Sequence, residues 1–214
     1  MEKTVGLIHF IIKDKISDLG KEAGIRAAQT IRDALHQKDQ ANIILATGTS
    51  QFGILNQLRQ EKIDWRRVTL FHLDEYIGLS ESSPASFRKY LKDRFIQYIS
   101  PPKAIHLING EEDPIMECQR LGGLIGKACI DLALVGIGEN GHLGFNDPPA
   151  DFDTTEPFIV VQLDDKCRRQ QLGEGWFKSI QEVPLHAITM SVRQIMKSGQ
   201  IICSVPDSRK AEAV

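Results

Sequence analysis

The sequence lacks an excess of positive charge and any long apolar run. Its 214 residues carry 26 Lys and Arg against 28 Asp and Glu, a net charge of -2. Proteins that bind nucleic acid present a basic patch or a recognition motif such as a helix-turn-helix, and neither is visible here. No apolar stretch approaches the roughly 20 residues of a membrane span. We therefore expect neither nucleic acid nor a membrane among its partners.

Paired cysteines are missing as well. The four cysteines form no C-x-x-C pair and have no histidine at ligand spacing, which argues against a zinc site or any other bound metal. We expect them to be buried free thiols in a reducing compartment. The residues around the short apolar run Leu7–Ile12 carry no small-residue cleavage site, so we expect no signal peptide and a cytoplasmic protein. The cysteines are Cys118, Cys129, Cys167 and Cys203.

Hydrophobic residues make up 42% of the chain and charged residues 25%, which is typical of a globular protein with one sizeable core. Apolar residues recur every fourth position between Leu19 and Leu35, so the pattern predicts a helix over Ser17–His36. Further helices are expected after Ser50 as far as about Arg59, from Pro84 onward, and between Pro114 and Ala128. The expected strands are Asn42–Thr47, Val68–Leu73, Leu132–Val135, Phe158–Leu163, Ala187–Val192 and Gln200–Val205.

Strands that alternate with helices predict a doubly wound, mostly parallel sheet with helices on both faces, in a Rossmann-like single domain over residues 1–214. In such α/β sheets, the ligand lies beyond the carboxyl ends of the strands. Four polar segments follow predicted strands, so we expect them to share one site. They are Thr47–Ser50, Asp74, Gly136–Asp147 and Val205–Lys210.

The glycine-rich loop after Leu132–Val135 matches the dinucleotide pattern G-x-G-x-x-G over Gly136–Gly141. That pattern requires a helix directly after it. Pro148 and Pro149 follow instead and disfavour a helix there. We therefore expect no dinucleotide and no other cofactor.

The same loop carries His142, a residue type suited to proton transfer. Asn140 can orient the ring, and Asp147 can favour its protonated form, so the three side chains could act as a proton-transfer unit. A histidine in a glycine loop can also be purely structural, and the sequence leaves both roles open.

The segment Ala46-Thr-Gly-Thr-Ser50 joins a strand to a helix. Gly48 permits the turn, and the first N–H groups of the helix, with the hydroxyls of Thr47, Thr49 and Ser50, would suit a phosphate. The sequence is equally compatible with Thr49 or Ser50 simply capping the helix.

Two adjacent carboxylates, Asp74 and Glu75, follow the strand Val68–Leu73. Side chains alternate along an extended chain, so one can face a pocket while the other forms a salt bridge. Asp74 could be catalytic or structural, and His72 could share its face or pack in the core. Lys210 could reach an anionic substrate or remain solvated.

Taken together, the motifs resemble the glucosamine-6-phosphate deaminase (isomerase) family over almost the whole chain. The resemblance implies opening of an amino-sugar phosphate ring, transfer of a proton from C2 to C1, and loss of ammonia to leave a ketose phosphate. The matching segments are Thr47-Gly-Thr-Ser50, Leu73-Asp-Glu-Tyr-Ile-Gly-Leu79, Gly136-Ile-Gly-Glu-Asn-Gly-His-Leu-Gly-Phe-Asn-Asp-Pro148 and Ser208-Arg-Lys210.

The resemblance also assigns roles to residues. Asp74 matches the base that takes the C2 proton, and His142 matches the residue that opens the ring. Asn140, which is aspartate in some relatives, and Asp147, usually glutamate, would assist. The phosphate would be bound by Thr47, Gly48, Thr49, Ser50 and Lys210, with Arg168 or Arg169 as candidates for a lid arginine.

The sequence is also compatible with two other functions. A lactonase acting on a sugar-phosphate lactone could use His142 to activate water, and Asp74 would then be structural. A sugar-phosphate sensor would bind without turnover. In all three cases the partner is a small-molecule sugar phosphate, and the sequence leaves a homo-oligomer open.

Overall fold

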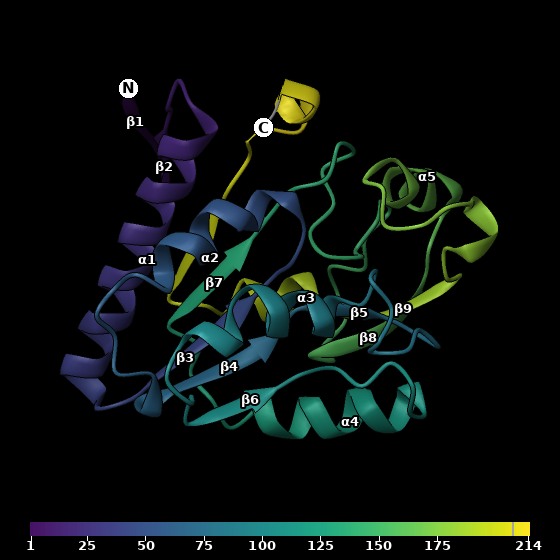
Figure 1. Ribbon diagram of the computed structural model, residues 1–214, viewed down its shortest axis with the longest axis horizontal. Helices are drawn as coiled ribbons and strands as arrows, with labels where there is room; N and C mark the ends of the chain where they lie inside the picture. The colour runs from purple at the N-terminus through teal and green to yellow at the C-terminus, as the bar shows by residue number, and fades with distance from the viewer. Residues whose placement is uncertain (207) are drawn as a thin grey trace.

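The computed structural model describes residues 1–206 and 208–214, and its centre is a five-stranded parallel sheet (Figure 1). This confirms the predicted α/β fold. Each expected strand lies within two residues of its predicted bounds. One short strand at the edge of this sheet, Ala104–His106, was not predicted. In order across the sheet the strands are β10 (Gln200–Cys203), β7 (Leu132–Val135), β3 (Ala41–Leu45), β4 (Val68–His72) and β6 (Ala104–His106).

Helices cover both faces of this sheet, as expected. The helices are α1 (Ile16–Lys38), α2 (Phe52–Leu58), α3 (Phe87–Arg94), α4 (Pro114–Ile125), α5 (Asp165–Gly173) and α6 (Val192–Ile195). Side chains alternate along β3, so Ile43 and Leu45 pack with α1, α2 and α3, whereas Ile44 packs with α4 and α6.

A second, antiparallel sheet lies beside the first one. It contains β5 (Asp74–Tyr76), β9 (His186–Met190) and β8 (Phe158–Gln162), in that order. The sequence predicted a mostly parallel sheet, and it did not predict that β8 and β9 form a separate antiparallel sheet with β5. An apolar run fixes a buried strand but not its partner, so the sequence could not assign the sheet.

The chain passes from one sheet to the other at Leu73. Its N–H donates to the carbonyl of Leu45 in β3 at 3.1 Å, and its carbonyl accepts from the N–H of Met190 in β9 at 2.8 Å. Leu73 is therefore hydrogen-bonded to both sheets, and Asp74 follows at a rigid position.

Besides β6, several other elements were not predicted, including β5 and α6. An N-terminal hairpin joins β1 (Glu2–Val5) to β2 (Ile8–Ile11), and the basic run after Asp164 forms α5. Asp164 begins that helix by accepting from the N–H of Cys167 at 2.6 Å, so it has a local capping role.

All four cysteines are free, but only Cys167 is buried. Cys129 and Cys203 are exposed, so the expectation of buried thiols was wrong for these two. None of the helices in the described ranges combines the length and apolar character needed to cross a membrane.

Two glycines set how closely α1 and α2 pack. A Cβ atom on Gly53 would lie 2.7 Å from the Cα of Gly20, closer than side chains tolerate. Because α2 begins directly after the Thr47–Ser50 loop, this contact also fixes the position of that loop.

We predict that Gly53→Ala lowers the free energy of unfolding by about 1–3 kcal/mol, because the added methyl must push the two helices apart. Gly123→Ala is the matched control, since a Cβ there meets no atom within 4 Å. It should be neutral or stabilise by up to about 1 kcal/mol through helix propensity. Urea unfolding of both variants checks this, and an unchanged Gly53→Ala protein would contradict the packing argument.

Candidate active site

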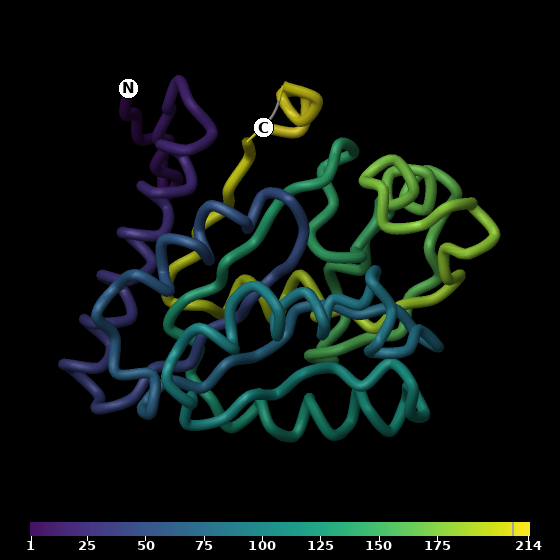
Figure 2. Tube along the Cα trace, viewed as in Figure 1, coloured from purple at the N-terminus to yellow at the C-terminus, as the bar shows by residue number. Residues whose placement is uncertain are grey.

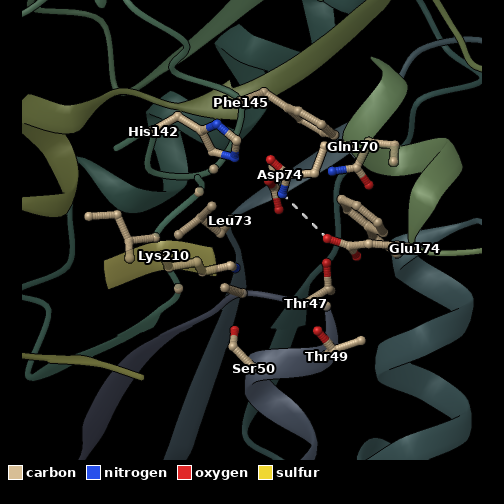
Figure 3. A pocket seen from close by; sticks show the side chains of 18 residues that line it. Thr47, Thr49, Ser50, Leu73, Asp74, His142, Phe145, Gln170, Glu174 and Lys210 are labelled. Carbon is tan, nitrogen blue, oxygen red and sulfur yellow. Dashed lines mark hydrogen bonds between the residues drawn. The ribbon is translucent and has the colours of Figure 1, made fainter. Parts of the chain in front are cut away.

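A pocket opens at the carboxyl ends of β3, β4 and β7, where the predicted segments meet (Figure 3). The loop of residues 136–157 runs between this end of the sheet and α5 (Figure 2). Of the predicted Val205–Lys210 segment, residue 207 lies outside the described residues, and Lys210 lines the pocket. The full lining is Ala46, Thr47, Gly48, Thr49, Ser50, Leu73, Asp74, Phe87, Gly136, Ile137, Gly138, His142, Gly144, Phe145, Gln170, Gln171, Glu174 and Lys210.

Asp74 lies in the pocket wall at the first residue of β5 and is only 6% exposed. Its Oδ1 atom has no hydrogen-bond partner within the described ranges. Burial, with a smaller contribution from the neighbouring Glu75 carboxylate, raises the pKa of Asp74 to about 8. A buried carboxyl that faces a pocket with a pKa near neutrality can exchange a proton with a bound ligand.

Glu75 points the other way, as the alternation predicted, and supports the site from behind. Its carboxylate accepts from the Ser86 hydroxyl at 2.9 Å and from the backbone N–H of Phe87 at 3.1 Å and of Arg88 at 2.8 Å. The Nε atom of the Arg88 guanidinium also donates to Oε2 of Glu75, at 3.3 Å. Glu75 therefore fixes the start of α3, from which Phe87 reaches the pocket.

His142 is held by two oxygen atoms on one side of its ring. Its Nδ1 lies 2.6 Å from Oδ1 of Asn140 and 3.0 Å from Oδ1 of Asp147. Because both neighbours are acceptors, Nδ1 carries the proton and Nε2 is left as the basic atom. Burial alone would raise the pKa of Asp147, but hydrogen bonds from His142 and Asn140 outweigh it and lower the pKa. The sequence grouped these three side chains correctly.

The loop also packs tightly against the imidazole of His142. A Cβ atom on Gly138 would lie 2.2 Å from Cε1 of His142, so only glycine fits there. The pattern that resembled a dinucleotide site therefore has another cause. No helix lies between β7 and β8, all of whose intervening residues are described.

The Thr47–Ser50 loop bends at Gly48, whose φ is 91°, and continues as a 3-10 turn, Thr49–Gln51, into α2. No side chain caps either element, so the capping alternative was wrong. The hydroxyls of Thr47, Thr49 and Ser50 point toward the pocket instead, as does the ammonium group of Lys210 (Figure 3).

The two candidate lid arginines do not line the pocket. The Arg168 guanidinium donates to the carbonyls of Ile180 at 2.6 Å and Val183 at 3.0 Å, and Arg169 is exposed. Gln170 and Gln171 of α5, with Glu174 directly after it, line the pocket in their place. No sequence pattern marked these three residues as part of the site. His72 is likewise outside the pocket, in the core, where its Nδ1 accepts from the N–H of Ile108 at 3.4 Å.

The described ranges contain no group of three His, Cys, Asp or Glu side chains placed to hold a metal ion. The pocket combines a buried acid, a positioned imidazole and a loop whose hydroxyl groups would suit an anion. Such a set can transfer protons on a bound anion.

The sequence model of glucosamine-6-phosphate isomerases and 6-phosphogluconolactonases matches residues 14–214. A glucosamine-6-phosphate deaminase of Bacillus thuringiensis (strain Al Hakam) is 36% identical over 194 residues, which is 90% of this chain and 71% of that protein. The chain belongs to this family. The resemblance seen in the motifs is thereby confirmed.

Solved structures of family members agree with the fold. One described as a monomeric glucosamine-6-phosphate deaminase has 34% identity and a TM-score of 0.81, covering 89% of this chain and 79% of its own. A 6-phosphogluconolactonase from Shewanella baltica has 17% identity and a TM-score of 0.77, covering 94% and 82%. At that identity, the second likeness concerns the fold alone.

We predict that Glu75→Gln lowers the free energy of unfolding by about 1–3 kcal/mol, because a neutral amide cannot accept all the hydrogen bonds that Ser86, Phe87 and Arg88 donate and leaves a buried donor unsatisfied. The Arg88 guanidinium keeps its ion pair with Glu111 at 2.9 Å. Glu81→Gln is the control, since the pair of Glu81 with Lys92 is exposed and should contribute less than about 1 kcal/mol. Urea unfolding measures both. Equal effects would show that the buried carboxylate is not a principal support of the site.

Proposed function

We propose that the protein is a glucosamine-6-phosphate deaminase, which converts glucosamine 6-phosphate and water to fructose 6-phosphate and ammonia. The observation that carries this proposal is the meeting of Asp74, His142 and the Thr47–Ser50 loop in one pocket. The family, with a curated deaminase at 36% identity, supports the same reaction.

His142 is proposed to open the sugar ring. Its Nε2 can take the proton of the C1 hydroxyl and deliver it to the ring oxygen as the bond between C1 and that oxygen breaks, which leaves an open-chain aldehyde. The imidazolium formed in this step is stabilised by Asp147, and Asn140 keeps the ring oriented.

Asp74 is proposed to move the proton from C2 to C1. The C2 proton is acidified by the adjacent carbonyl, so a carboxylate base is adequate. The free carboxyl holds a proton up to about pH 8, and a cationic amine bound beside it favours the ionised form. As this proton reaches C1, a proton of the ammonium group passes to the C1 oxygen, which leaves a hydroxyl at C1 and a protonated imine at C2. Water then adds to the imine carbon, and ammonia leaves as an ammonium ion to give the ketose.

The phosphate group is proposed to bind the Thr47–Ser50 loop and Lys210. The hydroxyls and the first N–H groups of the turn are neutral donors, and Lys210 supplies the charge. One solved relative is described as monomeric. The homo-oligomer left open by the sequence stays a prediction.

We predict that the protein releases ammonia and fructose 6-phosphate from glucosamine 6-phosphate in equal amounts, and that Asp74→Asn lowers kcat by a factor of about 100 or more. Coupled enzymatic assays of both products measure this, with thermal unfolding to show that the variant is folded.

The same preparations should be offered 6-phosphogluconolactone. Hydrolysis of the lactone without ammonia release from the amino sugar would replace the proposal with the lactonase alternative. Binding of the sugar phosphate without any turnover would indicate a sensor.

A further inference from the structure

Glu174 is a pocket residue with no role in the reaction described so far. It follows the last turn of α5, and its carboxylate points into the pocket on the side opposite Lys210 (Figure 3). Two neutral donors of the same segment hold it. The side-chain amide of Gln170 donates to Oε1 at 3.4 Å, drawn as a dashed line, and the indole N–H of Trp176 donates to Oε2 at 3.3 Å.

Neither donor neutralises the charge. The described ranges place no Lys or Arg in an ion pair with Glu174, although 17 ion pairs occur elsewhere in them. Both hydrogen bonds are long, so each oxygen keeps acceptor capacity. A half-buried carboxylate without a cation is unfavourable unless a ligand supplies one.

The pocket therefore has walls of opposite character. Lys210 and the hydroxyls of Thr47–Ser50 suit an anion, whereas Glu174 suits a cation. A sugar phosphate or lactone phosphate without an amine carries only the anionic group that suits Lys210 and the hydroxyls. An amino-sugar phosphate also carries an ammonium group, which suits Glu174.

We infer that Glu174 is a specificity-determining residue that pairs with the ammonium group of the substrate and so selects amino-sugar phosphates over their hydroxyl counterparts. The inference rests on the proposed function and deepens it. Asp74 is a poor substitute for this task, because its carboxyl must remain free to carry the C2 proton.

The test compares two ligands that differ only at C2, glucosamine 6-phosphate and glucose 6-phosphate. Binding is measured by calorimetry in the Asp74→Asn background, so that turnover does not interfere. We expect the amino ligand to bind at least about tenfold more tightly, the ratio equivalent to about 1.4 kcal/mol. Adding Glu174→Gln should remove that preference and leave the affinity for glucose 6-phosphate within about twofold.

Two further variants serve as controls. Glu174→Asp keeps the charge and should keep most of the preference, which separates a charge effect from a folding defect. Glu112→Gln removes a negative charge from an exposed position outside the pocket lining and should change neither affinity.

Three results would count against the inference. If the Glu174→Gln variant still prefers the amino ligand, or if it binds both ligands more weakly by the same factor, the assignment of Glu174 is wrong. The deaminase proposal stands in either case. If the unaltered protein shows no turnover and neither ligand binds the Asp74→Asn background, the proposed function fails and the inference fails with it.

Discussion

The passage of the chain from one sheet to the other at Leu73 is the constraint on which the pocket depends. Leu73 is hydrogen-bonded to β3 of the parallel sheet and to β9 of the antiparallel sheet, so it cannot shift relative to either. Asp74 is the next residue, so its backbone is held in place as well. A carboxyl with a strongly raised pKa requires such a position, because a mobile side chain would reach water and recover its ordinary pKa.

The neighbouring residues turn this position into a site. Glu75, facing away, fixes the start of α3, and Tyr76 packs against Phe87 and Phe145 with ring centroids 5.0 and 5.1 Å apart. These rings form a small core beneath the pocket and carry Phe87 and Phe145 into its wall. Stability and chemistry thus share one segment, in which Asp74 lines the pocket, Glu75 fixes α3 and Tyr76 packs in the core.

The sequence predicted the parallel sheet and the meeting of Thr47–Ser50, Asp74 and His142, because strand periodicity and the common edge of parallel strands follow from local pattern. It could not assign β8 and β9 to a second sheet, since a buried strand has the same pattern in either. The sequence also suggested Arg168 as an arginine of the pocket. Its guanidinium donates to backbone carbonyls instead, and such contacts produce no recognisable sequence pattern. Glu174 was missed because a carboxylate after a polar helix resembles any solvated residue.

The proposed mechanism depends on Asp74 being a buried acid that is protonated in the free protein and able to exchange a proton with the substrate. Carbon-13 NMR of protein labelled at the aspartate carboxyl groups measures this directly, with the Asp74 signal assigned by its loss in Asp74→Asn. The account predicts a titration midpoint near pH 8. A midpoint near 4, the ordinary value for aspartate, would contradict it.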